Sequence, residues 1–204
     1  MTKTRVINLT AHEAAAFQRG ATMLVMECKP QPRPPAGVTI MPHALDNGRF
    51  GFFDDDRDYV CPFGKPGDLL IGREAWGYRG QSVAIGHPLR VFDIAYKADG
   101  SRWSFRLYPD EAYGLPGQRL RNDDEPYEAY DQYLNEFWDM WLSAARMPQW
   151  AARVRRIVES VSLNRCQELT EGEIEAAGYD FREHNAKLWA ENRFVWVTSV
   201  KEET

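Results

Sequence analysis

Cysteine and histidine are scarce in this 204-residue chain, and neither is clustered. The three cysteines, Cys28, Cys61 and Cys166, lie far apart and form no Cys-x-x-Cys pair. This spacing excludes a zinc knuckle and a disulfide framework. The four histidines are also scattered, and no pair has the spacing that puts two metal ligands on one helical face. We therefore expect reduced thiols, no metal site and no cofactor.

Long apolar runs are also missing. No stretch approaches the roughly 18 apolar residues that cross a bilayer. The N-terminal segment 1–10 lacks the apolar core of a secretory signal. We therefore expect a cytoplasmic protein with no membrane partner.

An excess of positive charge is missing too, since the net charge is −5. This balance opposes sequence-independent binding to duplex DNA, because such affinity comes mainly from neutralising phosphates. The one concentrated basic stretch is 146–165, with five arginines against one acidic residue, Glu159. It is the natural place for an anion or a phosphate backbone to dock. The alternative is an arginine-rich strand that balances the acidic segment before it.

The composition is that of a folded protein. Hydrophobic residues make up 44% of the chain and charged residues 27%, which excludes the low-hydrophobicity, high-charge signature of disorder. A chain of this length buries a substantial core. We expect a single domain over residues 1–204.

Turn signals and apolar patterns predict alternating strands and short helices. Helices are expected from Thr10 to Gly20, from Thr170 to Gly178, where Glu173 completes a capping box, and around 181–189. Residues 46–66 read as a long loop or a hairpin insertion. Strands are expected at 6–9, 22–28, 69–71, 91–96, 154–163 and 194–200, the last four in one curved or closed sheet.

Residues 125–141 have aromatic side chains at three- and four-residue steps between acidic ones. This pattern predicts an acidic amphipathic helix with an aromatic face. The face packs against the core or binds a partner protein.

Five separated parts of the chain form a recognisable ordered set. They are Lys29-Pro30-Gln31-Pro32, 64–68 with Arg73-Glu74-Ala75-Trp76, Tyr96-Lys97-Ala98-Asp99, Met147-Pro148 with Trp150-Ala151-Ala152-Arg153, and the 169–178 helix. In this order they resemble the ASCH-domain proteins of bacteriophages. The resemblance implies an α+β fold: a PUA-like (ASCH-type) mixed β-barrel with flanking helices and one helical insertion, here at 110–138. It also implies a central cleft that holds RNA or a nucleobase.

One sequence element of that family is degenerate in this chain. ASCH proteins carry a Gly-x-Lys-x-x-Thr/Glu-x-Arg element after the first helix, and the small acetylcytidine amidohydrolases of the superfamily use its lysine and threonine with a later glutamate. With Gly20 as the glycine, Thr22 stands at the lysine position and Val25 at the threonine position. Only the glutamate remains, as Glu74. A lone carboxylate is a poor hydrolytic site.

Glu74 lies at the end of a predicted strand, where its carboxylate could accept hydrogen bonds from the exocyclic amine of a base. The neighbouring Arg73 belongs to the same candidate site or forms a structural ion pair with Glu74. Three aromatic residues in the resembling segments could stack on bases or belong to the core. These are Trp76, Tyr96 and Trp150, and the residues expected to hold phosphate are Arg146 and Arg153.

The leading hypothesis is a non-catalytic protein of phage origin that binds RNA, single-stranded nucleic acid or a modified nucleotide. A second is an amidohydrolase-like enzyme acting on an acylated nucleobase, with Glu74 as general acid and base and Lys29 supplying charge. A third is a protein-interaction factor that blocks a host defence protein through the helix at 125–141.

We predict that the protein does not hydrolyse acetylcytidine. Amide hydrolysis needs an activated nucleophile, a proton donor and oxyanion stabilisation within reach of one another. Losing a positioned acid or base costs a factor of about 10²–10⁴, and here the lysine and threonine positions are both changed. Chromatography of acetylcytidine incubated with the purified protein tests this. Turnover that disappears in Glu74→Gln would establish the enzyme hypothesis instead.

Overall fold

The computed structural model divides the chain into two compact units, which are described separately. Unit 1 comprises Met1–Ile7, His12–Gly72 and Val154–Thr204, and unit 2 comprises Asn8–Ala11 and Arg73–Arg153. The predicted single domain stays a prediction, and the predicted insertion at 110–138 lies outside the described residues. The structure describes residues 2–32, 42–45, 49–53, 57–83, 90–107 and 140–203.

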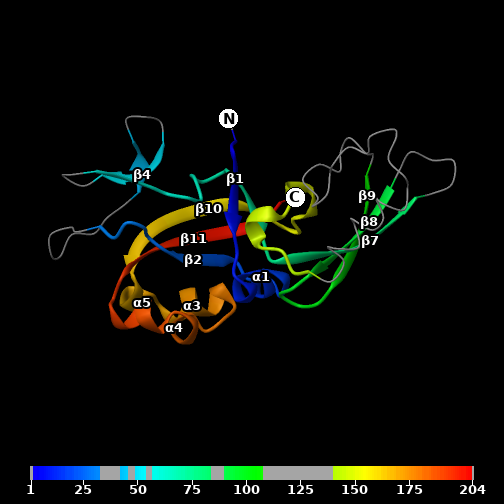
Figure 1. The fold of residues 1–204 in the computed structure, drawn as a ribbon. Helices are drawn as coiled ribbons and strands as arrows, with labels where there is room; N and C mark the ends of the chain where they lie inside the picture. The colour runs from blue at the N-terminus through cyan, green and yellow to red at the C-terminus, as the bar shows by residue number, and fades with distance from the viewer. Residues whose placement is uncertain are drawn as a thin grey trace. The chain divides into compact units, whose positions relative to one another are not determined.

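Unit 1 is organised around a five-stranded sheet (Figure 1). The long central strands β10 and β11 pair antiparallel with each other, β10 also pairs antiparallel with β6, and β11 with β2. The sheet order is β1 (Thr4–Asn8), β6 (Leu69–Arg73), β10 (Val154–Arg165), β11 (Phe194–Glu202), β2 (Met23–Glu27). In the described residues this sheet ends at β1 and at β2, so it is open where a closed barrel was predicted.

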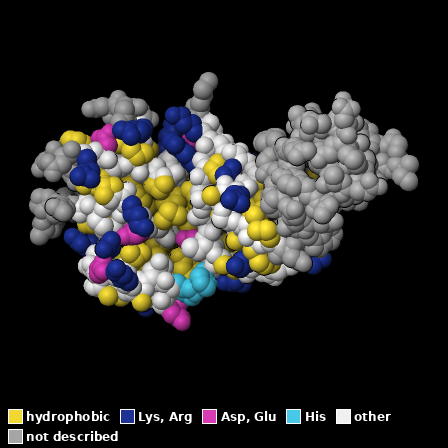
Figure 2. Space-filling view, viewed as in Figure 1, with side chains coloured by type: hydrophobic (Ala, Val, Ile, Leu, Met, Phe, Trp, Pro, Cys, Tyr) yellow, Lys and Arg dark blue, Asp and Glu magenta, His cyan; other side chains and the backbone are white. Residues whose placement is uncertain are grey.

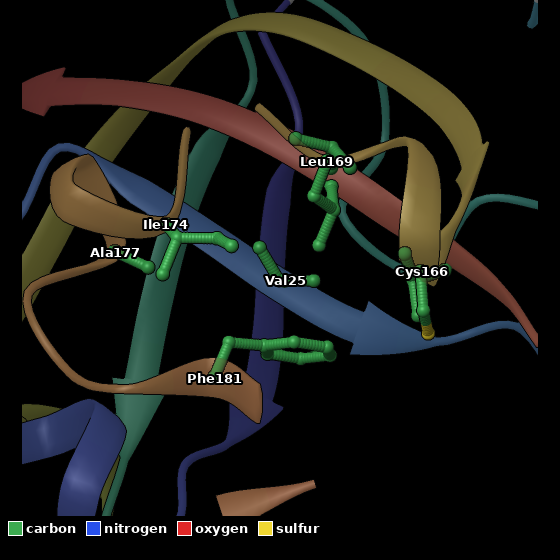
Figure 3. Packing of buried hydrophobic residues seen from close by; sticks show 8 residues of the cluster. Val25, Cys166, Leu169, Ile174, Ala177 and Phe181 are labelled. Atoms are coloured by element: carbon green, nitrogen blue, oxygen red, sulfur yellow. The ribbon is translucent and has the colours of Figure 1, made fainter. Parts of the chain in front are cut away.

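Short helices cover one face of this sheet. Val25 of β2 and Val195 and Val197 of β11 point toward them, because alternate strand residues face the same side. Figure 3 shows Ile174 of α3 and Phe181 of α4 packed against Val25 in this buried cluster. The helices are α1 (Ala11–Gln18), α3 (Glu171–Ala177), α4 (Phe181–His184) and α5 (Ala186–Ala190). The fold is therefore α+β, as the sequence predicts.

The predicted capping box at α3 is present. The Thr170 hydroxyl accepts from the Glu173 amide at 3.2 Å, and the Glu173 carboxylate accepts from the Thr170 amide at 2.7 Å. Gly178 ends the helix in the left-handed conformation with φ of 74°, where glycine carries no side-chain penalty. The sequence signals at both ends of this helix are therefore confirmed.

Residues predicted as a long loop or hairpin at 46–66 contain part of a second, small sheet in unit 1. Its order is β3 (His43–Ala44), β4 (Phe50–Phe53), β5 (Asp58–Val60), all antiparallel. Phe52 of β4 stacks on Tyr59 at 4.5 Å and lies 5.9 Å from Trp196 of β11. The side chain of Trp196 therefore lies on the opposite face of β11 from those of Val195 and Val197.

Unit 2 contains a three-stranded antiparallel sheet with the order β7 (Trp76–Val83), β8 (Arg90–Tyr96), β9 (Arg102–Leu107). A bulge interrupts the β7–β8 ladder between Tyr78 and Gly80. Leu142 extends the sheet beyond β7 through a bridge to Trp76. The prediction that 91–96 shares a sheet with 69–71, 154–163 and 194–200 is wrong, because β8 pairs along its length with β7 and β9 instead.

None of the helices in the described part of the chain is long and apolar enough to cross a membrane.

We expect Thr170→Ala to lower the free energy of unfolding by about 0.5–2 kcal/mol, because the α3 amide at Glu173 loses its capping acceptor. Thr170→Ser is the matched control, since serine keeps the hydroxyl. Urea denaturation followed by circular dichroism measures both variants. Equal stability of the alanine and serine variants would show that the cap contributes nothing.

Candidate nucleic-acid interface

Unit 2 holds a buried ion pair between Glu74, directly after β6, and Arg153, directly before β10. The Arg153 Nε donates to Glu74 Oε1 at 2.7 Å, and Nη2 donates to Oε2 at 3.0 Å. Both side chains are 1% exposed. Parallel hydrogen bonds of this kind are the geometry in which a guanidinium and a carboxylate bind most strongly.

The third nitrogen of Arg153 reaches the turn between β8 and β9. Its Nη1 donates to Asp99 Oδ2 at 2.8 Å and to Ser101 Oγ at 2.7 Å. The guanidinium also lies 4.1 Å from the centre of the Tyr96 ring, and the Tyr96 hydroxyl donates to the carbonyl of Ala151 at 2.7 Å. Three separate chain segments, around 74, 96–101 and 151–153, therefore meet at this arginine.

The two carboxylates around Arg153 are in different environments. Burial raises the pKa of Glu74 above its ordinary value, and the ion pair with Arg153 opposes that rise. Burial also favours a higher pKa for Asp99, but hydrogen bonds from Arg153 and Ser101 outweigh this effect and lower the pKa from 3.8 to about 2. Burial raises the pKa of Tyr96 as well, so the phenol stays protonated at neutral pH.

The structure therefore brings together three of the residues predicted to bind a ligand, Glu74, Tyr96 and Arg153, but in a closed, buried arrangement. The Glu74 carboxylate is 1% exposed and both of its oxygens accept from Arg153, so it is not open to a base edge. Trp76 is fully buried, which supports the alternative that it belongs to the core. The Arg153 side chain is also 1% exposed and donates to Glu74, Asp99 and Ser101, so it is not open to a phosphate.

The other predicted residues lie elsewhere. Arg73 does not pair with the adjacent Glu74; its Nη1 donates to the Ala145 carbonyl at 3.3 Å. Arg146 is exposed at the end of a short 3-10 helix, η1 (Ala144–Arg146). Lys29 belongs to unit 1, where its ammonium lies 2.9 Å from the Glu27 carboxylate.

An aromatic surface that was not predicted lies on β9. The Trp103 side chain is 46% exposed, and its ring is stacked beside Phe105 at 6.4 Å and edge-on to Tyr96 at 6.2 Å. The predicted Trp150, on the 3-10 helix η2 (Gln149–Ala151), is half-buried and meets Phe105 edge-on at 5.3 Å. We call Trp103, Phe105 and Trp150 the aromatic platform.

The opposite face of β9 is basic. Arg102 and Arg106 are both exposed and alternate along the strand with Trp103 and Phe105. Neither guanidinium forms an ion pair with another residue in the part of the chain that the structure describes. Between them, the Ser104 hydroxyl donates to Asp93 at 2.6 Å. The edge strand thus has rings on one face and, on the other, two arginines whose guanidinium groups form no ion pair within the described ranges.

Several described cations of unit 1 form ion pairs with nearby carboxylates. Figure 2 shows dark blue Lys and Arg side chains next to magenta Asp and Glu side chains over the part of the molecule that Figure 1 shows as the sheet and helices of unit 1. Examples are the pairs Arg155–Glu203, Arg182–Glu171, Arg193–Glu27 and Lys201–Glu159. Among the described residues, the arginines of β9 are therefore more available to an anionic ligand than these paired ones.

The sequence contained a signal for this surface. Residues 102–106 read Arg-Trp-Ser-Phe-Arg, a strict alternation of polar and aromatic residues that is typical of an edge strand with two different faces. The segment lies outside the basic stretch at 146–165, which drew the prediction toward Arg146 and Arg153 instead.

The described residues provide no evidence for a metal site or a reactive thiol. Among the described residues no group of three or more His, Cys, Asp or Glu side chains is placed to hold a metal ion. All three cysteines are buried, and burial raises the pKa of Cys28 and Cys61 to about 12 and that of Cys166 to about 11. Thiols with such pKa values are protonated and weakly reactive at neutral pH.

Comparisons with models of protein families, with curated proteins and with solved structures give no match for this chain. A function is therefore inferred from its own residues.

We expect Arg153→Met to lower the free energy of unfolding by about 3–5 kcal/mol, because Glu74 would be left as an unpaired buried charge. Adding Glu74→Leu should recover most of that loss, since a buried ion pair replaced by apolar side chains is often neutral in stability. Urea denaturation followed by tryptophan fluorescence measures the cycle.

The matched control for this cycle is Arg155→Met, which breaks a partly exposed pair with Glu203 and should change stability by only about 0–1 kcal/mol. A loss in Arg153→Met no larger than in this control would show that Arg153 is not needed to neutralise Glu74.

Proposed function

We propose that this protein binds single-stranded nucleic acid, without catalysis, on the β7–β8–β9 sheet of unit 2. The observation that carries the proposal is the half-exposed ring of Trp103, which contacts the rings of Phe105 and Tyr96. On the opposite face of the same strand, Arg102 and Arg106 have no ion pair with any residue that the structure describes. Aromatic side chains on a sheet that stack on bases, next to cations that contact the backbone, form a recurring arrangement for single strands.

The aromatic platform supplies a surface for stacking. The Trp103 ring packs beside Phe105 and edge-on to Tyr96, and these contacts orient it. A base would therefore stack on a ring that is already oriented. Stacking on such a ring stabilises a complex by about 1–3 kcal/mol per base and tolerates any base, because every base has a π-face. The preferred ligand is therefore a strand with unpaired bases, whose faces are not already covered by neighbours in a duplex.

Phosphates would contact Arg102 and Arg106 at the other face of the same edge strand. Arg146, which is exposed, remains a candidate for a further phosphate contact. The net charge of −5 opposes strong binding to a duplex, so the affinity depends on this local pair of cations together with stacking. RNA and single-stranded DNA both satisfy this chemistry.

The ASCH-like origin, a PUA-like relationship, a phage source and a location in the bacterial cytoplasm belong to the same proposal. They are supported by the ordered segments that resemble that family. Catalysis on an acylated base is not favoured, because the Glu74 carboxylate is held by Arg153 through both oxygens.

Protein interaction is the second candidate function. Met140 and Trp141, the end of the predicted acidic aromatic segment, are 49% and 43% exposed. The Arg79 guanidinium lies 4.6 Å from the Trp141 ring. An exposed aromatic next to an arginine is a common composition of protein interfaces.

We expect Trp103→Ala to weaken binding of a single-stranded oligonucleotide by about 5- to 150-fold, which corresponds to the loss of one stacked base. Fluorescence anisotropy with a labelled RNA of mixed sequence measures the affinity. Phe53→Ala, which removes an exposed ring from β4 of unit 1, is the control and should leave the affinity unchanged. Equal effects of both variants would contradict the proposed location.

We expect the double variant Arg102→Ala, Arg106→Ala to flatten the dependence of affinity on salt. For single strands the slope of log affinity against log salt falls by about 0.7 for each phosphate contact that is lost. The same anisotropy assay over a salt series gives this slope, and Arg155→Ala, from an ion pair of unit 1, is the control. A wild-type protein that shows no salt-dependent binding to any single strand would leave protein interaction as the better function.

A further inference from the structure

Arg153 holds together the two segments that carry the aromatic platform. Trp150 precedes it by three residues, on η2, and Trp103 follows Ser101 by two residues, on β9. Because Arg153 Nη1 bonds both Asp99 and Ser101, one guanidinium connects the start of β9 to the segment of Trp150. Phe105 and Trp150 meet 5.3 Å apart where these segments join.

Asp99 has a double role in the turn before β9. Its Oδ1 accepts from the Ser101 amide at 3.0 Å and from the Ser101 hydroxyl at 2.8 Å, which shapes the turn. Its Oδ2 accepts from Arg153 at 2.8 Å. One carboxylate therefore forms the turn with one oxygen and fixes the turn to Arg153 with the other.

Arg153 has two sets of interactions, the Glu74 arm (its hydrogen bonds to Glu74) and the Asp99 arm (its hydrogen bond to Asp99), and the fold depends on them to different degrees. The Glu74 arm is fully buried and neutralises a buried charge, so the fold requires it. The Asp99 carboxylate is 33% exposed, and a partly exposed ion pair contributes little to stability. The Asp99 arm is thus available for a role other than holding the fold together.

We infer that Asp99, acting through Arg153, is a positioning residue for the nucleic-acid surface: it keeps Trp103 and Phe105 of β9 in register with Trp150 without touching the ligand. This inference rests on the proposed function for its ligand. Fixing rings in place before binding removes the cost of ordering them when the ligand arrives, which is the usual benefit of pre-organisation.

Asp99→Asn separates this role from the turn itself. Asparagine forms the same side-chain turn through its amide oxygen, but its NH₂ group meets the Arg153 N–H donor and cannot accept from it. Asp93→Asn is the matched control, because Asp93 lies on β8 of the same sheet and bonds Ser104 on the opposite face. Both variants remove one negative charge.

The two variants should change oligonucleotide affinity in opposite directions. Removal of a negative charge by itself favours a polyanion, so Asp93→Asn should bind a labelled single-stranded RNA equally or more tightly. Asp99→Asn should bind it about 2- to 12-fold more weakly, the cost of ordering one side chain on binding. Its salt slope and its thermal midpoint should stay close to those of the wild type, since neither a phosphate contact nor the buried pair is lost.

A second measurement examines the rings without any ligand. The protein is labelled with 5-fluorotryptophan, and the fluorine resonances of Trp103 and Trp150 are assigned from Trp103→Phe and Trp150→Phe variants. Asp99→Asn should shift or broaden both resonances, and Asp93→Asn should leave them unchanged.

Each outcome separates the two proposals. Unchanged resonances in Asp99→Asn overturn the positioning role, whatever the oligonucleotide does. Altered resonances together with affinity like that of Asp93→Asn also overturn it, because the rings then move without consequence for binding. Altered resonances in a protein whose wild type binds no single strand support positioning of the rings and overturn the nucleic-acid function.

Discussion

A buried guanidinium carries a charge that it cannot lose, because its pKa stays far above neutrality, and it must therefore be surrounded by acceptors. Arg153 satisfies that requirement with Glu74, Asp99 and Ser101, while the Tyr96 ring covers its face. These acceptors lie at two points of unit 2, Glu74 after β6 and the pair Asp99 and Ser101 in the turn before β9. The junction after β6, the turn before β9 and the segment ahead of β10 are thus fixed relative to one another by a single electrostatic requirement.

Local features of the fold could be predicted from the sequence, whereas the pairing of distant segments could not. The helix from Thr170 to Gly178 was predicted because its cap and its stop are encoded within a few residues of each other. Glu74 and Arg153 were each selected as candidates, yet their contact spans 79 positions of the chain, and no local pattern specifies it. The alternative of an Arg73–Glu74 ion pair came from their adjacency in the sequence, and Arg73 instead donates to the Ala145 carbonyl.

The six predicted strands are present as β1, β2, β6, β8, β10 and β11, but β7 and β9 were missed for a related reason. β7 contains two glycines and an arginine among its first five residues, Trp76-Gly77-Tyr78-Arg79-Gly80, so its propensity for a strand is weak and its pairing with β8 determines its structure. β9 has a clear alternation of polar and aromatic residues. Its exposed Trp103, however, fits neither the pattern of a buried core strand nor that of a basic segment. Residues at which chemistry and burial disagree, such as Trp103, are informative about function because the fold does not explain their exposure.

The ladder between β6 and β10 has a topological consequence. Gly72 and Val154 are direct partners in this antiparallel pair, and the chain between them forms nearly all of unit 2. Antiparallel partners lie about 4.5–5.5 Å apart, a gap that a tight hairpin closes. Apart from Asn8–Ala11, unit 2 is therefore one continuous insertion whose two ends enter and leave unit 1 at neighbouring positions of paired strands.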